Sequence, residues 1–592
     1  MKHDLIIKIC MGTGGLAAGG QEVMNAFKTQ LKGKGITADI RKNCSLHKVG
    51  CRGLCAKDVL VDITLRNVKT TYQFISPDMV ARIIEEHIIG GTPVQEWAVS
   101  EDYHQFHDKQ FKIVLSDCGL IDPEDIHSYI NVGGYDALKQ VLDTMSREET
   151  IDVIRKSGLR GRGGAGFPTG TKWDACFKAV SDQKYIICNA DEGDPGAFMD
   201  RAIIEGNPHS VIEGMIIGAY SIGSDKGYVY IRAEYPLAVE RLRMALTQAR
   251  EEKFLGRNIL GKNFDFDIKI KLGAGAFVCG ESTALMFSIE GKRGMPRVTP
   301  PRSTEAGLWK KPTCLNNVET FANVPYIIRN SAEWYASYGT EKSKGTKVFA
   351  LTGKIKNSGL IEVPMGIPLR EIIYDIGGGI ENNKKIKAVQ MGGPSGGCIP
   401  ADKLDVPVDF ESLTALGAMV GSGGLVVMDE DSCMVDVAKY FLQFTQSESC
   451  GKCTPCRIGT KRLLEILERI TQGEGRAGDI DLLLDLSADI KVSSLCGLGQ
   501  SAPNPILTTI RYFRDELEAH VRDKKCPAGV CRKLLAYFIY AERCKGCGAC
   551  IRACPSGAIT GKKKQPHQID ADACIKCGSC FTVCKFKAIG RE

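Results

Sequence analysis

Cysteines in short, regular spacings carry the strongest chemical signal in this chain of 592 residues. The chain contains 25 cysteines, and fifteen of them follow residue 432. The segment SESCGKCTPC places three thiols in a C-x2-C-x2-C run, and SSLCGLGQ supplies a more distant fourth. Three closely spaced thiolates suit an iron–sulfur cubane better than a zinc ion. We therefore predict a [4Fe-4S] cluster bound by Cys450, Cys453, Cys456 and Cys496.

The last fifty residues contain the same cysteine motif twice. CKGCGACIRACPSGAI and CIKCGSCFTVCKFKAI both follow the bacterial ferredoxin pattern C-x2-C-x2-C-x3-C. In that pattern the fourth cysteine of each run binds the cluster of the other run. The second run has Lys585 where proline is usual. The predicted [4Fe-4S] ligands are Cys544, Cys547, Cys550 and Cys584 for one cluster and Cys574, Cys577, Cys580 and Cys554 for the other.

A third cysteine group, in HVRDKKCPAGVC, is incomplete. His520, Cys526 and Cys531 form a plausible zinc set that lacks its fourth ligand. Structural cysteines without a metal are the alternative interpretation.

Near the N-terminus, Cys10 ends a predicted strand (LIIKIC), a helix is predicted at about 21–31, and Cys51 and Cys55 follow that helix. This region resembles the thioredoxin-like [2Fe-2S] ferredoxin domain, whose pattern is C-x4-C followed by C-x3-C. Gly15 stands where the second thiolate is expected, and such a cluster needs four ligands. Either Cys44 or a non-cysteine residue completes the site, or the cluster is lost and the fold remains.

A glycine-rich stretch, GLRGRGGAGFPTGTKW at residues 158–173, indicates a nucleotide or flavin site. Glycine lets backbone amides approach a phosphate or a flat ring closely, and neighbouring cations hold an anion. Gly161, Gly163 and Gly166 match the dinucleotide pattern G-x-G-x-x-G. A helical pattern precedes the loop, however, whereas a Rossmann loop follows a strand, so we predict a non-Rossmann site.

Downstream of this loop the chain alternates between strand and helix patterns. The predicted strand at 184–198 carries Asn189, Asp191, Glu192 and Asp194 at its carboxyl end, where α/β sheets place ligands. Together with GAGAFVCGESTA and KPTCLNNVET, this region resembles the flavoprotein subunit of respiratory complex I. It also resembles the diaphorase subunits of soluble [FeFe]-hydrogenases and formate dehydrogenases, and the resemblance covers residues 150–500.

The resemblance implies FMN on the glycine stretch, with NAD(P)H stacked over it and Phe167 on the adenine side. Amide side chains suit the polar edges of the flavin ring, and cations suit its phosphate. The glycine loop also contributes Gly161, Arg162 and Gly166 to the predicted cofactor site. The implied FMN contacts are Gly163, Gly164, Lys172, Asn189, Asp191, Glu192, Gly280, Glu281, Asn316 and Asn317.

The nucleotide site departs from the family pattern. The family sequence G-A-Y-x-C-G-E-E reads GAFVCGES here, with Phe277 for tyrosine and Ser282 for glutamate, and Asp194 replaces a further glutamate. A carboxylate near the ribose accepts from the 2′-OH and repels a 2′-phosphate. Its loss favours NADP(H), with NAD(H) as the alternative.

Composition predicts a multidomain α/β protein that works in the cytoplasm. Neither a signal peptide nor an apolar run long enough to cross a membrane is present in the sequence. Net charge is +7, and residues 541–592 contribute ten Lys or Arg against four Asp or Glu. This basic tail lacks the aromatic platforms of nucleic-acid binders, which favours an acidic protein partner.

We predict five domains joined by two short segments. They are a thioredoxin-like domain (1–95), an FMN- and NAD(P)-binding α/β core (150–345), a β-grasp-like domain (346–430), a helical bundle holding [4Fe-4S] (431–525) and a ferredoxin domain with two clusters (541–592). A connecting segment (96–149) and a hinge with the possible zinc site (526–540) join them.

These predictions describe a diaphorase subunit. A flavin exchanges a hydride with NAD(P)H and single electrons with iron–sulfur clusters, so it belongs between them. The resemblance implies a hetero-oligomer with a separate hydrogenase catalytic subunit and a small [2Fe-2S] subunit. The appended ferredoxin domain implies exchange with ferredoxin and electron bifurcation. The alternatives are an NAD-dependent subunit of a formate dehydrogenase or other reductase, and a non-catalytic electron wire.

Overall fold

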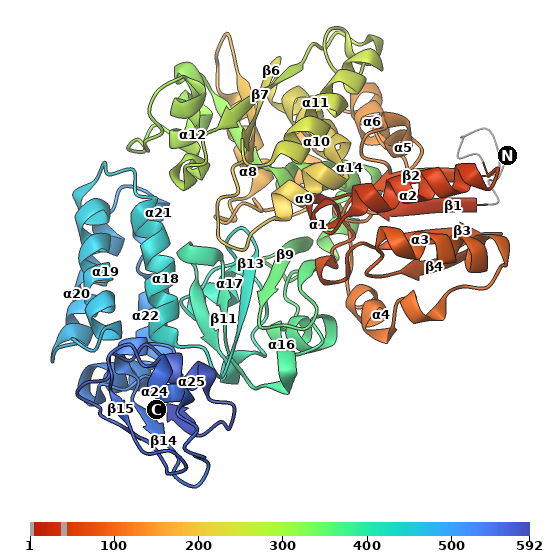
Figure 1. The fold of residues 1–592 in the computed structure, drawn as a ribbon. Coiled ribbons are helices and arrows are strands. Elements are labelled where there is room, and N and C mark those ends of the chain that lie inside the picture. Colours follow the sequence, from red (N-terminus) through yellow and green to blue (C-terminus); the bar gives the residue numbers. More distant parts are fainter. Residues whose placement is uncertain (1–4, 37–43, 592) are drawn as a thin grey trace. The chain divides into compact units, whose positions relative to one another are not determined.

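The computed structural model describes residues 5–36 and 44–591, and the chain divides into two compact units. The first comprises residues 1–384, 389–396 and 401–427, and the second comprises 385–388, 397–400 and 428–592. We describe each unit by itself. The elements that hold the candidate sites are labelled in Figure 1.

A mixed four-stranded sheet forms the N-terminal region of the first unit. Its order is β2 (Cys44–Val49), β1 (Leu5–Cys10), β3 (Val61–Leu65) and β4 (Val68–Tyr72), with β1 and β2 parallel and the other pairs antiparallel. Helix α2 (Gly20–Gly33) buries Val23, Phe27 and Leu31 at helical spacing, which confirms the predicted strand and helix. Short helices α1 (Thr13–Ala17) and α3 (Val80–Arg82) complete this region.

The segment predicted as a connection, residues 96–149, packs as part of the central core. It forms α4 (Glu101–Asp108), α5 (Ile126–Ile130) and α6 (Asp136–Thr144). Tyr129, Leu138 and Val141 are fully buried in the same hydrophobic cluster as the flavin-domain sheet. The sequence hides this role because its apolar residues are divided among short helices and turns.

A parallel four-stranded sheet organises the core that is predicted to bind FMN. Its order is β7 (Asp267–Gly273), β6 (Lys226–Arg232), β5 (Tyr185–Ala190) and β8 (Thr313–Asn317). The buried apolar run of β5 is typical of parallel strands covered on both faces. The surrounding elements are α7 (Arg147–Lys156), α8 (Thr169–Lys178), α9 (Met199–Gly206), α10 (Pro208–Ile222), α11 (Pro236–Glu251), α12 (Ser282–Ile289), α13 (Ser303–Ala306), α14 (Val318–Asn330) and α15 (Ala332–Ala336).

Short strands follow this core, as the sequence predicts. β9 (Thr346–Gly353) pairs antiparallel with β10 (Gly359–Pro364) and parallel with β13 (Gly424–Asp429). The other elements of this region are β11 (Ile386–Met391), β12 (Gly397–Pro400), α16 (Leu369–Glu371) and α17 (Phe410–Ala415).

The second unit contains a helical bundle and the cysteine repeat. The bundle helices are α18 (Met434–Ser447), α19 (Thr460–Thr471), α20 (Asp479–Ser493) and α22 (Asn504–Tyr512), and they bury Leu442, Leu463, Leu483 and Ile506. Helix α22 ends at Tyr512, and α23 (Arg514–Glu518) begins after Phe513. The repeat forms β14 (Tyr537–Ile539), α24 (Ala549–Ala553), β15 (Ile559–Thr560), β16 (Gln568–Ile569), α25 (Ser579–Val583) and β17 (Ile589–Arg591).

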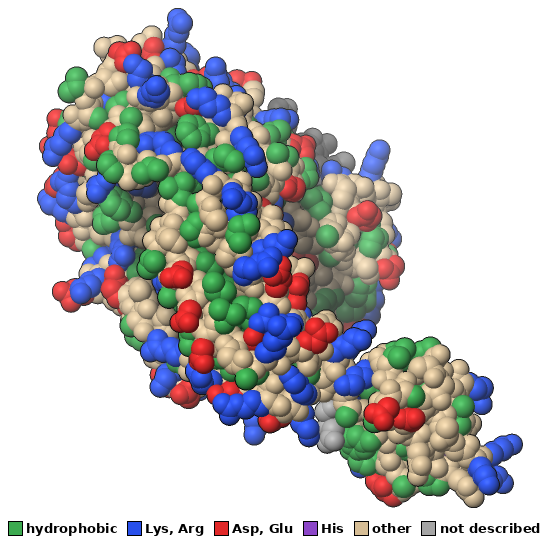
Figure 2. Space-filling view, turned by 90° about the vertical axis from the view of Figure 1, so that its left-hand side faces the viewer, with side chains coloured by type: hydrophobic (Ala, Val, Ile, Leu, Met, Phe, Trp, Pro, Cys, Tyr) green, Lys and Arg blue, Asp and Glu red, His purple; other side chains and the backbone are tan. Residues whose placement is uncertain are grey.

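Among the described residues, no helix is long and apolar enough to traverse a lipid bilayer. On the face drawn in Figure 2, Lys and Arg side chains are interspersed with Asp and Glu. Such mixed surface charge is ordinary for a globular protein.

Candidate flavin, nucleotide and metal sites

The glycine loop lies between α7 and α8, so a helix precedes it as predicted. Gly166 has φ +61°, and a Cβ there would lie 2.8 Å from the ring of Phe410. A Cβ on Gly163 would lie 3.0 Å from the Cβ of Asn317. The loop therefore has room only for glycine at Gly166, and at Gly163 a side chain would press on an asparagine implied in FMN binding.

Two of the loop's three cations stabilise the loop itself. Arg162 is fully buried, and its guanidinium donates to the Tyr335 hydroxyl at 3.0 Å and to the Lys344 carbonyl at 2.6 Å. Arg160 forms an ion pair with Glu411. The structure thus places the predicted Arg162 cation in the protein interior. The Lys172 amine donates to the Leu315 carbonyl at 2.7 Å, and burial lowers its pKa.

Parallel strands bring the predicted asparagines together. Asn189 in β5 pairs in register with Asn317 in β8, because both lie at the carboxyl ends of adjacent strands. Asn189 donates to the Gly280 carbonyl at 2.9 Å, while the Asn317 oxygen accepts from the Glu319 amide at 3.0 Å and caps α14. The Asn316 oxygen accepts from the Trp173 indole at 3.1 Å. Its buried Nδ2 has no partner among the described residues and remains free to donate to a ligand.

The predicted acidic residues follow β5 and have different partners. Asp191 forms an ion pair with Arg232 at 3.3 Å. Glu192 accepts from the backbone amides of Asp200 at 3.1 Å and Arg201 at 3.3 Å, and burial raises its pKa to about 7. Burial likewise raises the pKa of Asp194 to about 6, although the Ser422 hydroxyl donates to it.

The segment that departs from the family pattern leads into α12. Phe277 is half-buried at the start of the turn Phe277–Gly280, and a Cβ on Gly280 would lie 3.3 Å from the Asp191 carbonyl oxygen. Glu281 caps α12 by accepting from the amides of Thr283 and Ala284 at 3.0 and 2.9 Å. The Ser282 hydroxyl donates to Glu281 at 3.0 Å, so residue 282 places no carboxylate in the adjoining space.

A cavity of about 260 Å³ opens beside these residues. Phe167 lines it with 43% of its surface exposed, and the Lys172 amine lies 5.9 Å from the centre of the Phe167 ring. Arg302 also lines it, a residue that the sequence did not single out because no motif contains it. The lining residues are Phe167, Thr171, Lys172, Ala175, Ser282, Thr283, Thr299, Arg302, Ser303, Thr304, Thr313 and Leu315. An exposed aromatic ring and a lysine in this cavity fit a flavin or nicotinamide nucleotide. The unpaired Asn316 amide belongs to β8, the strand that supplies the lining residues Thr313 and Leu315.

The bundle cysteines come from three separate turns of the second unit. Cys450 and Cys453 follow α18, Cys456 lies in the turn Pro455–Gly459, and Cys496 caps the short helix α21 (Gly497–Ser501). Burial raises the pKa of Cys456 to about 11, and the thiols of the other three add to the shift, which indicates that all four are near neighbours. Four thiols this close can bind one cluster as thiolates, because the bound metal offsets the repulsion between their negative charges.

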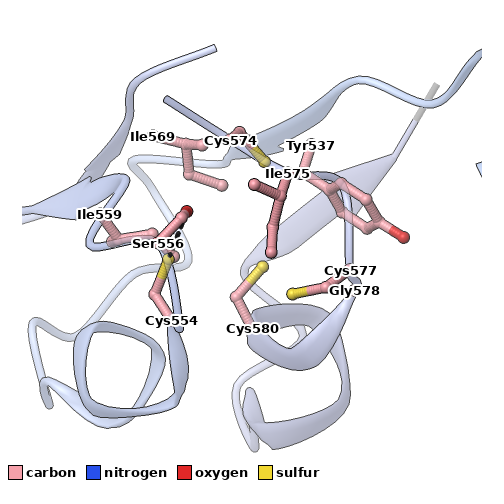
Figure 3. A pocket seen from close by; sticks show the side chains of 10 residues that line it. All are labelled: Tyr537, Cys554, Ser556, Ile559, Ile569, Cys574, Ile575, Cys577, Gly578 and Cys580. Atoms are coloured by element: carbon pink, nitrogen blue, oxygen red, sulfur yellow. Dashed lines mark hydrogen bonds between the residues drawn. The ribbon is translucent and has the colours of Figure 1, made fainter. Parts of the chain in front are cut away.

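The eight cysteines of the repeat line two separate pockets, grouped as predicted. Cys544, Cys547, Cys550 and Cys584 line one, and Cys554, Cys574, Cys577 and Cys580 line the other. In Figure 3, sulfurs of the second group surround a space bounded by Ile559, Ile569 and Ile575. The fourth cysteine of each run thus meets the three thiols of the other run.

The possible zinc site gains a fourth side chain, Cys433. The ligand atoms of Cys433, His520, Cys526 and Cys531 all lie within 4.8 Å of one another, and all four residues are buried. The His520 Nδ1 contacts the Glu516 carbonyl at 2.7 Å, and its Nε2 lies 3.4 Å from the Cys433 sulfur. Three thiolates and one imidazole fit a tetrahedral zinc ion. Cys433 precedes His520 by 87 residues, so no local motif links the two. The only sign of Cys433 in the sequence was that the set of His520, Cys526 and Cys531 lacked a fourth ligand.

The N-terminal cysteines also converge. The sulfurs of Cys51 and Cys55 are 3.6 Å apart, and Cys10 is fully buried at the end of β1. The side chain of Cys44 lies outside the described residues. Among the described residues, these three cysteines alone do not complete a four-ligand site.

Comparisons with known proteins agree with this arrangement. Family models match residues 154–326 (Nuo51 FMN-binding domain), 348–399 (SLBB domain), 436–520 (NADH-ubiquinone oxidoreductase-F iron-sulfur binding region) and 543–588 (4Fe-4S dicluster domain). The chain is 61% identical to the NADP-reducing hydrogenase subunit HndC of Solidesulfovibrio fructosivorans, over 78% of this chain and 93% of that protein.

Two further relatives agree. The F subunit of the NADH-quinone oxidoreductase of Aquifex aeolicus is 45% identical over 67% of this chain and 91% of its own length. A crystal structure of NAD+-reducing [NiFe]-hydrogenase in the H2-reduced state matches with a TM-score of 0.63 and 30% identity, covering 88% of this chain and 85% of that one. The chain therefore belongs to the family of complex I flavoprotein subunits, whose members are NAD(P)H-dependent flavin and iron–sulfur oxidoreductase subunits.

Proposed function

We propose that this chain is the diaphorase subunit of a hydrogenase complex and exchanges electrons between NADP(H) and iron–sulfur clusters through FMN. The observation that carries this proposal is the cavity lined by Phe167 and Lys172. The strand-end asparagines lie on the adjacent strands β5 and β8, and β8 also supplies the lining residues Thr313 and Leu315. When bound there, FMN exchanges a hydride with nicotinamide and single electrons with clusters. The 61% identity to an NADP-reducing hydrogenase subunit supports the hydrogenase complex.

The residues predicted to hold FMN and the nucleotide have separable tasks. The glycine loop and the Asn316 amide hold the polar edge of the flavin, and Lys172 supplies positive charge for its phosphate. Phe167 offers a flat apolar surface for the adenine ring. The cysteine sets of the bundle and the repeat would hold three [4Fe-4S] clusters, which would supply single-electron transfer to or from the hydrogenase catalytic subunit, the small [2Fe-2S] subunit and ferredoxin.

NADP(H) is the favoured nucleotide because of Ser282 and Arg302. Both line the cavity, and no ion pair of Arg302 is present among the described residues. A guanidinium can bind a 2′-phosphate through paired hydrogen bonds, and a neutral Ser282 does not repel it. A glutamate at 282 would instead accept from a ribose 2′-OH.

Nucleotide preference tests this assignment. We expect the purified complex to contain FMN and to show a higher kcat/KM for NADPH than for NADH. Ser282→Glu should reverse the preference, and Arg302→Ala should lower kcat/KM for NADPH by about tenfold, the loss of one charged hydrogen bond of roughly 1.5 kcal/mol. Lys292→Ala, a change to an exposed lysine that pairs with Glu290, serves as a control. A strong NADH preference in the unmodified complex would exclude the NADP assignment.

The proposal also includes electron bifurcation, in which the two electrons of a hydride leave the flavin for different acceptors. The fused ferredoxin domain supports it, because a second acceptor path starts within the same chain. We expect the purified complex to reduce NADP+ from its terminal donor only when ferredoxin is present. Reduction at the same rate without ferredoxin would exclude bifurcation and leave a simple diaphorase.

A further inference from the structure

The three N-terminal cysteines form an incomplete metal site that lacks the fourth ligand of a two-iron cluster. Cys10 ends β1, and Cys51 and Cys55 border the loop that follows β2. The Cys51 and Cys55 sulfurs are 3.6 Å apart, and the Gly53 amide donates to the Cys51 sulfur at 3.3 Å. The thiols of Cys10 and Cys51 also share a hydrogen bond. An amide donor aimed at one sulfur of a thiol group is typical of iron–sulfur sites.

Gly15, which stands where the family pattern has its second thiolate, has no room for a side chain. A Cβ on Gly15 would lie 2.4 Å from the Cys10 carbonyl oxygen and 3.2 Å from the Cys10 sulfur. The first distance is far below any real Cβ contact, so the backbone at Gly15 would have to move to admit a cysteine. A fourth ligand must therefore come from another element.

Asp58 brings a carboxylate to the same space. Both of its side-chain oxygens are buried, and the Cys10 thiol and the Leu60 amide are the donors that act on this carboxylate. A Cβ on Gly14 would lie 3.0 Å from Asp58 Oδ2 and 3.6 Å from the Cys55 sulfur, so the carboxylate and this thiol face one small space. The Asp58 charge also acts on the thiols of Cys10 and Cys51.

Among the described residues, no cation forms an ion pair with the buried Asp58 carboxylate. Burying a polar group without a partner costs free energy, and burying a charge costs more. Arg52, a buried cation that acts on Asp58, forms its ion pair with Asp62 instead, and Lys69 also pairs with Asp62. A bound cation at the three thiols would satisfy the Asp58 carboxylate.

We propose that Asp58 is the fourth ligand of a two-iron cluster whose other ligands are Cys10, Cys51 and Cys55. Carboxylate oxygen is an established ligand for iron, and it carries the same single negative charge as a thiolate. Asp58 therefore replaces the missing thiolate without changing the charge of the ligand set. This site is separate from the flavin cavity and from the twelve cysteines assigned to the four-iron clusters.

Spectroscopy of the reduced full-length chain tests the assignment. After anaerobic reconstitution with iron and sulfide, we expect a two-iron electron paramagnetic resonance signal at temperatures where four-iron signals are too broad to detect. Asp58→Ala should remove this signal and about two iron atoms per chain, while Asp58→Cys should retain the iron with a shifted signal and absorption spectrum. FMN content and the four-iron signals report whether the rest of each variant has folded.

Two controls address the alternative ligands. Cys44→Ser should retain the two-iron signal, as should Asp78→Asn, which changes an exposed carboxylate of the same domain. Absence of the two-iron signal from a wild-type chain that holds its four-iron clusters would overturn the proposal. An unchanged signal and iron content in Asp58→Ala would overturn it as well, because another ligand would then complete the site. If Asp58→Ala does not fold, Asp58→Cys decides, since an unshifted spectrum would exclude ligation by residue 58.

Discussion

At the scale of single residues, Asp194 makes a pH-dependent contribution to stability. Burial raises its pKa to about 6, above the ordinary value of 3.8. The folded chain then keeps a proton that the unfolded chain releases, so this stabilisation is complete below pH 3.8 and is lost as pH rises through about 6. Asp194→Asn removes the titration while keeping the shape of the side chain. Between pH 5 and 7.5, we expect the wild type to lose about 1 kcal/mol more stability than Asp194→Asn, measured by denaturant unfolding. Parallel pH profiles would contradict this account.

Cys433 is the residue on which the zinc assignment depends. Even changes to groups that orient a ligand reduce metal affinity by about 10–100-fold, so losing a direct ligand should reduce it further. We expect Cys433→Ala to lose zinc on dialysis against a chelator while its four-iron clusters remain. Cys398→Ala is the matched control, because Cys398 is equally buried in the same unit and contacts Thr508 rather than the metal set. Equal zinc content in the two variants, measured by mass spectrometry of the metals, would rule out the site.

At the scale of elements, the glycine loop should tolerate no side chain at Gly166. Alanine there must adopt φ +61° and meet the Phe410 ring at 2.8 Å, and a strained residue of this kind costs about 1–3 kcal/mol. We expect Gly166→Ala to weaken FMN binding by about tenfold, the equivalent of 1.4 kcal/mol. Gly261→Ala is the control, since Gly261 also has positive φ but has open space around its Cβ position. Flavin fluorescence titration measures both, and equal affinities would show that the loop is not the flavin floor.

The elements that could be predicted are those whose signals are local in sequence. The β5 strand with its carboxyl-end acids, the helix before the glycine loop and the repeated cysteine runs each depend on neighbours within a few residues. Cys433 and Arg302 could not be predicted as site residues, because only the folding of distant segments brings them to their sites. Asp58 was hidden for another reason. An aspartate near a turn is ordinary, and only its burial beside the thiols, with no ion pair among the described residues, makes it informative.

At the scale of the whole molecule, charge is concentrated at one end of the chain. Residues 541–592 contribute a net +6 to a chain of net +7 before any cluster is bound. Lys562 and Lys563 are exposed between β15 and β16, in the same domain as the two cysteine pockets. Positive charge beside an electron-transfer site raises the encounter rate with an acidic partner, and salt screens this effect.

The proposed exchange with ferredoxin should therefore depend on these lysines and on ionic strength. We expect Lys562→Glu with Lys563→Glu to lower kcat/KM for ferredoxin by about tenfold at low salt, because charged residues at an interface mainly change association rates. NADPH oxidation by ferricyanide should be unaffected, since ferricyanide does not need the ferredoxin domain. Lys28→Glu with Lys32→Glu reverses two exposed charges on α2 and is the matched control. If both pairs reduce the rate equally, net charge alone governs the encounter. If neither pair reduces it, the C-terminal domain is not where ferredoxin binds.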